Sequence, residues 1–216
     1  MATQNAINKK TGQLTVDPGA AGDSFVQFNI ATVAKFRIGG YDTDNSFRVS
    51  QGSALGTNDM MTISTAGEVN LPLQPTFSAY LSAQQANVTG NGTAYSYVCD
   101  TEVFDVGGNY ATGTGVFTAP ITGRYFLSAG AYLTGSVTID RILVYIVTSN
   151  RTYRTMIYRN ASAEGIWGNI SVLVDMDASD TAYPQTYTYG NGADTSDLEP
   201  STATEMKTFF AGYLAC

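Results

Sequence analysis

Hydrophobic residues in this chain alternate with polar ones or form wholly apolar runs of four to ten residues. Glycine, asparagine, aspartate and proline separate the runs, and the periodicity of an amphipathic helix is nearly absent. The pattern predicts an all-β protein. In the second half of the chain, the predicted strands are 77–83, 93–99, 101–105, 124–133, 139–148, 152–159, 168–176, 182–189 and 207–215.

A boundary is expected at the segment "NLPLQP", residues 70–75, because proline cannot donate to a central β-ladder. We therefore expect two parts, 1–72 and 76–216. The first is expected to be a meander of very short strands, each with one apolar face. The residues on these faces are Phe36 and Ile38, Phe47 and Val49, Met61 and Ile63, and Val69 and Leu71. So short a meander has too little core to stand alone, and we expect it to associate with copies of itself.

Two strands of the second part are apolar on both faces. They lie in "RILVYIVTS" and "KTFFAGYLAC". Because a sandwich strand normally has one solvated face, we expect the outer face of one sheet to be buried in a homotrimer. The interface candidates are Leu143, Tyr145, Phe209, Phe210 and Tyr213. The sequence leaves open which of the two faces lines the trimer axis.

Composition narrows the possible functions. The chain has 216 residues, of which 44% are hydrophobic and 13% charged, and its net charge is −7. Nucleic acid and anionic membranes both select basic surface, so neither is expected as a partner. No apolar run is long enough to span a membrane, and the N-terminus lacks the apolar segment of a signal peptide.

The absence of histidine removes the common nucleophile systems, the HExxH zinc site and a histidine general base. Cys99 and Cys216 form no CxxC pair, and we expect them to be buried free thiols rather than a disulfide. We expect no enzymatic activity and no cofactor. Asp100 and Glu102 could serve as a pair of glycosidase carboxylates, but an ordinary strand edge is the better interpretation.

The segment "TGVFTAPITGRYFLSAGAYL", with "PTFSAYLSAQ" before it and "FFAGYLAC" at the end, resembles the jelly-roll head of complement component one q and tumour necrosis factor-like proteins. In this stretch Pro120 and Gly123 are expected to build a turn, and Phe117 and Tyr125 to anchor the core on either side of it. Gly212 is expected to permit close packing. The resemblance covers residues 76–216 and implies a trimeric, ten-strand-type jelly-roll sandwich. Leu127 departs from it, since the family usually has phenylalanine there.

Residues 1–72 resemble segments of bacteriophage tail and virion fibres, through "FRIGGYDTDNSFRVSQGSALGTNDMMTISTAGEV". Together the two resemblances imply a trimeric fibre, knob or decoration protein, made in the host cytoplasm and placed on the virion surface. The N-terminal part would contact other virion proteins, and the head would attach to a host-surface glycan or protein. The alternatives are a non-viral extracellular or spore-surface binding module of the same fold, and a glycan-cleaving tail spike.

Two sets of site residues follow. Asp175, Asp177 and Asp180 could bind calcium, which prefers carboxylate oxygens, although a solvated strand end explains them equally simply. Tyr183, Tyr187 and Tyr189 share a strand face that leads into a polar loop, 190–205, and tyrosine is favoured at recognition surfaces. With Asp194 and Asp197 they are the receptor-binding candidates. The alternative is that these tyrosines are core or subunit contacts.

Overall fold

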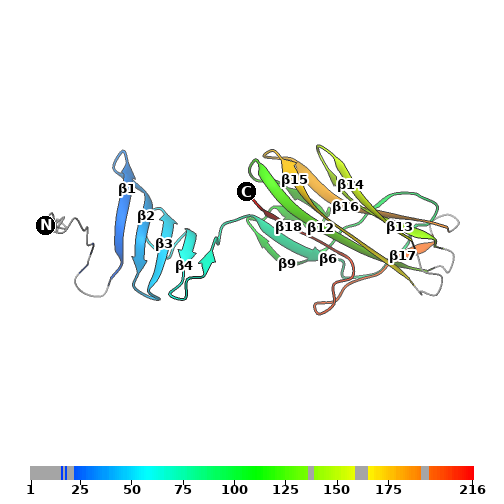
Figure 1. The fold of residues 1–216 in the computed structure, drawn as a ribbon, viewed down its shortest axis with the longest axis horizontal. Helices are drawn as coiled ribbons and strands as arrows, with labels where there is room; N and C mark the ends of the chain where they lie inside the picture. The colour runs from blue at the N-terminus through cyan, green and yellow to red at the C-terminus, as the bar shows by residue number, and fades with distance from the viewer. Residues whose placement is uncertain (1–15, 17, 19–21, 136–138, 159–164, 191–194) are drawn as a thin grey trace. The chain divides into compact units, whose positions relative to one another are not determined.

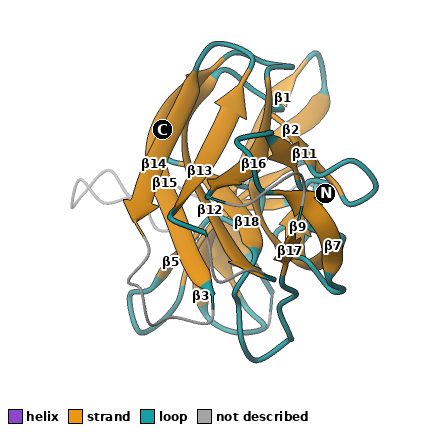
Figure 2. Cartoon of the chain, turned by 90° about the vertical axis from the view of Figure 1, so that its right-hand side faces the viewer, coloured by secondary structure: helices purple, strands orange, loops and turns teal. Residues whose placement is uncertain are grey.

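The computed structural model describes residues 22–135, 139–158, 165–190 and 195–216, together with Val16 and Pro18. These residues form strands, turns and loops without a helix (Figures 1 and 2). The chain divides after Gln74 into two compact units. The expectation of an all-β protein is confirmed.

The N-terminal unit is one antiparallel sheet whose strands follow one another in sequence order (Figure 1). Each strand pairs with the next, as expected of a meander. The first strand of the sheet, residues 24–30, was not predicted from the sequence, so the sheet is larger than expected. Its strands are β1 (Ser24–Ile30), β2 (Val33–Tyr41), β3 (Ser46–Gln51), β4 (Asp59–Ile63) and β5 (Val69–Asn70).

The C-terminal unit, which we call the head, contains two sheets. The six-stranded sheet has the order β10-β11-β16-β13-β14, with β8 also paired to β16. Its strands are β8 (Tyr95–Ser96), β10 (Tyr110–Ala111), β11 (Val116–Thr118), β13 (Arg141–Thr148), β14 (Thr152–Tyr158) and β16 (Thr181–Tyr189).

The seven-stranded sheet has the order β7-β17-β12-β18-β6-β9, with β15 paired to β12. Strands that are neighbours here are distant in sequence, as the jelly-roll resemblance implies. They are β6 (Thr76–Tyr80), β7 (Gln85–Thr89), β9 (Thr101–Val106), β12 (Gly123–Thr134), β15 (Ile166–Met176), β17 (Ser196–Leu198) and β18 (Phe209–Leu214).

The core of the head is built largely from aromatic rings. Phe77 stacks on Phe117 with the ring centroids 4.7 Å apart, and Phe117 lies 5.5 Å from Tyr125. All three side chains are buried, and the Tyr125 hydroxyl donates to the carbonyl oxygen of Ile121 at 2.8 Å. The expected pairing of Phe117 and Tyr125 across the turn is therefore present. Such ring pairs add stability beyond the area that they bury.

Gly212 lies where β18 passes close to its neighbours in the sheet. A Cβ atom at this position would lie 2.5 Å from Cδ2 of Leu127, 2.9 Å from the carbonyl oxygen of Phe126 and 3.0 Å from the ring of Phe77. The expectation of close packing at Gly212 holds within the sandwich, because every one of these contacts belongs to the same chain.

Three local expectations were wrong. The predicted strand 93–99 shortens to β8, because Tyr97 and Cys99 enter the core from an irregular segment. The predicted loop 190–205 contains β17, which pairs with β7 and β12. Cys99 is buried as expected, but Cys216 is exposed at the end of the chain.

Candidate functional site

The predicted receptor tyrosines lie on the outer side of the six-stranded sheet. We call this surface the tyrosine face; it comprises Leu143, Tyr145, Tyr183, Tyr187 and Tyr189. Leu143 pairs with Tyr187 across β13 and β16. The rings of Tyr145 and Tyr187 stack at 5.3 Å, and the Tyr145 hydroxyl donates to the Tyr187 hydroxyl at 2.6 Å. The structure thus brings two trimer candidates and the three receptor tyrosines together on one surface.

The rings of the tyrosine face are held by contacts with one another and with a nearby arginine. Tyr189 lies edge-on to Tyr187, with their centroids 5.3 Å apart, and the guanidinium carbon of Arg141 sits 4.2 Å from the Tyr189 centroid. Partial burial, helped by the hydrogen bond with Tyr145, raises the pKa of Tyr187. The surface offers aromatic area with polar groups at its margin, a combination typical of recognition surfaces.

Leu143 and Tyr145 have little area left for a second subunit. Their exposed fractions are 4% and 7%, because same-chain neighbours already cover them. The more accessible apolar groups nearby are Met156 and Tyr158 on β14, with exposed fractions of 48% and 64%. Both pair with β13 residues and share the tyrosine face's side of the sheet.

A second surface, on the outer side of the seven-stranded sheet, is more apolar. We call it the apolar face; its residues are Phe104, Phe126, Leu173, Phe209 and Tyr213. Tyr213, Phe126 and Leu173 form one row across β18, β12 and β15. The Phe126 and Tyr213 centroids are 5.4 Å apart. Exposed fractions are 48% for Phe104 and Tyr213 and 54% for Leu173.

The apolar face contains a shallow groove of about 190 Å³. Phe104, Phe126 and Tyr213 are among its aromatic lining residues, and small residues such as Ser128 and Ala211 contribute to the rest. The surface combines projecting rings with a recess. A surface of this shape can pack closely against another protein, because the cores of protein interfaces are packed as densely as protein interiors.

One predicted interface residue, Phe210, belongs instead to the core. It is fully buried, with its ring edge-on to Phe77 at 5.0 Å and to Tyr110 at 6.1 Å. Successive residues of a strand point to opposite faces of the sheet, so Phe210 faces inward while Phe209 and Tyr213 face outward. The predicted interface set is therefore divided among two outer faces and the core.

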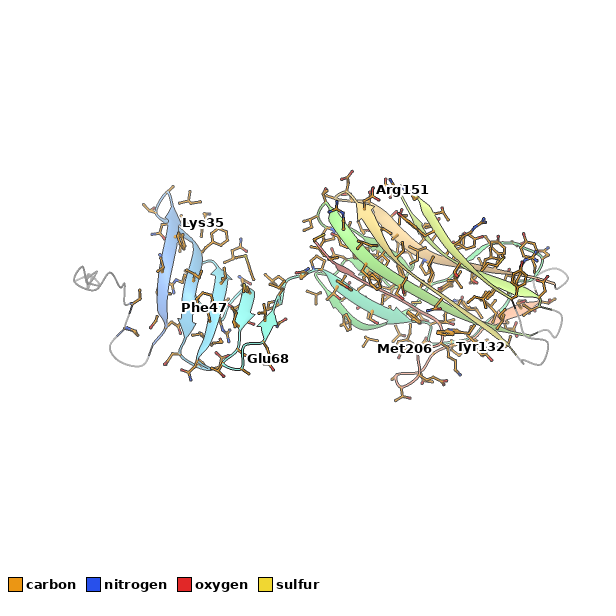
Figure 3. The ribbon with its side chains drawn as sticks, viewed as in Figure 1. Lys35, Phe47, Glu68, Tyr132, Arg151 and Met206 are labelled. Carbon is orange, nitrogen blue, oxygen red and sulfur yellow. The ribbon has the colours of Figure 1, made fainter. Side chains whose placement is uncertain are left out.

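The three aspartates proposed for calcium contact other groups of the same chain. Asp175 pairs with Arg151, which Figure 3 labels. Asp180 accepts hydrogen bonds from Asn150 Nδ2 at 2.8 Å and from the backbone N–H of Asp177 at 2.9 Å. Within the described part of the chain, no three acidic, histidine or cysteine residues gather in a way that could hold a metal ion. These carboxylates take part in an ion pair and in turn contacts, and calcium binding by them stays a prediction.

Of the two acidic receptor-binding candidates, the structure describes only one. Asp194 lies outside the described residues. Asp197 belongs to β17, and its carboxylate accepts the backbone N–H of Asn87 at 2.8 Å. Its neighbour Leu198 is fully buried. The structure gives Asp197 a role in holding the β7 segment.

Sequence reasoning missed a third surface feature. Tyr132, Trp167, Glu205, Met206 and Lys207 line a hollow of about 450 Å³, and Figure 3 labels Tyr132 and Met206 along the lower side of the head. Trp167 Nε1 donates to the carbonyl oxygen of Lys207 at 3.0 Å, so the half-exposed indole is held in place. The sequence did offer a signal: Trp167, its only tryptophan, stands between Ile166 and Gly168 in a strand-like run. Both neighbours are buried, so strand alternation puts the indole on the outer face.

Comparison with known proteins places the head in a family. The C1q domain model matches residues 66–215, so the chain belongs to the C1q domain family and the expected resemblance is confirmed. Domains of this family typically form homotrimers and bind ligands, and they are generally binding or structural modules rather than enzymes. Among curated proteins, no sequence matches.

Three solved structures are similar to this chain, and the first of them shows the same fold. The vertex protein P5 of the phage PRD1 aligns over 76% of this chain and 86% of its own, with a TM-score of 0.52 and 12% identity. The globular domain of a zebrafish complement 1qA protein aligns over 66% and 98%, with a TM-score of 0.49 and 13% identity. Murine APRIL aligns over 65% and 98%, with a TM-score of 0.45 and 10% identity. No helix among the described residues is long and apolar enough to cross a membrane.

Proposed function

We propose that this protein is a homotrimeric surface protein of a bacteriophage virion, a fibre, knob or decoration protein that attaches to the host surface. The observation that carries the proposal is a C1q-family head joined to a separate β-meander unit. The similarity in fold to a phage vertex protein, over three-quarters of this chain, supports a place on the virion. The resemblance of residues 1–72 to segments of phage tail and virion fibres supports it too.

Assembly of the head uses the apolar face. Obligate interfaces are more hydrophobic than ordinary surface, and this face exposes Phe104, Leu173 and Tyr213 at about half their area. The tyrosine face is the poorer candidate, because Leu143 and Tyr145 are already covered by their own chain. In the proposed trimer, the seven-stranded sheets meet around the axis.

Attachment then falls to the tyrosine face. Tyrosine supplies large contact area at low entropic cost and carries a hydrogen-bonding hydroxyl, which suits a glycan or a protein ligand. Tyr183, Tyr187 and Tyr189 stay accessible when the opposite sheet is used for assembly. We propose binding without catalysis.

A second candidate function is a non-viral binding module, extracellular or on a spore surface. The C1q family match favours it as strongly as it favours a virion protein, because the family as a whole binds ligands. On this alternative, the same tyrosine face would bind its ligand outside any virus particle.

Mass spectrometry of purified phage particles from the source organism tests the proposal. We expect the protein as a stoichiometric component, and antibodies against the head should block adsorption of the phage. Absence from intact particles, together with its presence on the surface of uninfected cells or spores, would favour the second candidate instead.

A further inference from the structure

The N-terminal sheet has almost no core of its own. Among the described residues of this unit only Ser46, Ser50 and Leu55 are buried, and two of these three are serines. The sheet is a single layer of five strands. A stable sheet must bury its hydrophobic face against another element, and nothing in the described part of this unit does so.

Strand pairing places most of the apolar residues of this sheet on one side. Val26 pairs with Ile38, Ile38 with Val49, and Val49 with Met61, so a continuous apolar row crosses four strands. Residues in such a row point to the same face. A second row joins Phe47, Ile63 and Val69, and Phe28 pairs with Phe36. We call this surface the meander face; it comprises Val26, Phe28, Ile30, Phe36, Ile38, Phe47, Val49, Met61, Ile63 and Val69.

Much of the meander face is open to solvent in a single chain. Exposed fractions are 54% for Phe28, 63% for Ile30, 42% for Phe47 and 60% for Val69. Phe47 lies in the middle strand of the sheet (Figure 3). An apolar surface that spans a whole sheet marks an interaction site.

The opposite side of the sheet is polar and internally satisfied. Arg48 forms ion pairs with Asp44 and Asp59, and Asp59 also accepts a hydrogen bond from the Ser50 hydroxyl. Arg37 lies over the ring of Phe25 at 3.9 Å. This side can face water, so only the meander face requires a cover.

The chemistry of the meander face favours copies of itself as the cover. None of its ten residues is charged or carries a hydrogen-bonding side chain, and Gln51, which pairs with Phe36, adds one amide beside them. The face therefore offers little specific polar pairing to a different protein. An apolar surface of this kind needs only another apolar surface of similar extent. The same face on a second chain meets that need.

The link to the head makes such copies available. β5 ends at Asn70 and β6 begins at Thr76, which leaves five residues between the sheet and the head. Five extended residues span at most about 18 Å. In the proposed homotrimer, three meander faces are therefore tethered close together, and short tethers give effective concentrations on the order of millimolar.

We infer that the three N-terminal sheets of one trimer pack their meander faces against one another and form a second assembly domain with a shared apolar interior. This rests on the homotrimer of the proposed function. The polar sides of the three sheets face outward and are the surface through which other virion proteins would be contacted.

Adjacent residues of β1 supply a matched test in the full-length protein. Phe28 lies on the meander face and Asn29 on the polar side, and both are exposed. We expect Phe28→Lys to accelerate amide hydrogen exchange in β1 to β4 at least tenfold, while Asn29→Lys leaves it unchanged. Both variants should keep the mass of three chains by light scattering and slow exchange in the head.

A second measurement does not depend on charge. Phe47→Cys, in a Cys216→Ser background, should yield covalently linked pairs of chains with a short bis-maleimide, because the meander faces meet and each chain offers one accessible thiol. Asn29→Cys in the same background should yield only single chains on a denaturing gel. Cys99 does not interfere, since it is buried and its burial raises the pKa of the thiol.

The outcomes separate this inference from the proposed function. A wild-type trimer in which Phe28→Lys and Asn29→Lys exchange alike, and in which Phe47→Cys gives no cross-link, would overturn the inference and leave the head trimer standing. A different protein would then cover the meander face. A wild-type protein with the mass of one chain would overturn the homotrimer itself, and the inference with it.

Discussion

Tyr213→Arg and Tyr158→Arg are a matched pair of substitutions on opposite sheets of the head. Tyr213 lies on the apolar face with an exposed fraction of 48%, and Tyr158 lies beside the tyrosine face with 64%. Both residues are tyrosines on a strand, and both side chains have room for an arginine in the single chain. We expect Tyr213→Arg to dissociate the trimer and Tyr158→Arg to leave it intact.

The expected cost follows from what Tyr213 would bury in the trimer. An aromatic side chain buries about 150–250 Å² in all, so the half still exposed corresponds to about 100 Å². At ~25 cal/mol per Å², its removal costs about 2.5 kcal/mol. An unpaired buried charge adds about 3–5 kcal/mol. The sum is about 6 kcal/mol at each of the symmetry-related sites, which corresponds to a factor of about 10⁴ in affinity per site.

Analytical ultracentrifugation over a range of protein concentrations is the assay. Tyr158→Arg should sediment as the wild type does, and Tyr213→Arg should sediment as single chains or aggregate at the same concentration. Thermal melts show whether loss of the trimer coincides with unfolding, as expected for an obligate assembly. If Tyr158→Arg dissociates the protein while Tyr213→Arg does not, the six-stranded sheet lines the axis and the assignment of the two faces is reversed.

Three further predictions concern the head. Gly212→Ala should lower the free energy of unfolding by about 1–3 kcal/mol through overpacking, whereas Gly113→Ala, which meets nothing within 4 Å, should stay close to wild type in urea titrations. Leu198→Ala should cost about 2–5 kcal/mol, because the side chain is fully buried; a near-neutral result would mean that β17 does not close the core. Iodoacetamide should modify Cys216 in the native protein and Cys99 only after denaturation, as peptide mass mapping would show, because burial raises the pKa of the Cys99 thiol; rapid native labelling of Cys99 would contradict its burial.

Local patterns were sufficient for the strands that are long and regular. β12, β13, β15 and β16 were all expected within two residues of their observed bounds, because they alternate or are wholly apolar over many residues. The strand β17 has three residues and could not be found in this way. Its pairing with β7 and β12 depends on contacts across the sheet, which are remote in sequence.

The candidate interface residues were chosen by residue type and strand pattern, which do not show the surface on which each residue lies. Leu143, Tyr145, Phe209 and Tyr213 were grouped because each sits on a strand with apolar residues on both faces. The tertiary structure assigns them to two different sheets. Which residue a strand turns inward follows from its partner sheet, so the sequence of a single strand cannot say that Phe210 is core and Phe209 is not.

The sequence alone therefore determined the all-β class, the family resemblance of the head and the lack of a core in the meander, since these depend on composition, short-range alternation and local motifs. Only the tertiary structure decided which apolar residues remain uncovered. Burial is a property of the whole packed chain: Leu143 is covered by neighbours on other strands, whereas Tyr213 and Phe28 are left about half exposed. The assembly surfaces proposed for this protein are the apolar area that its own fold leaves uncovered.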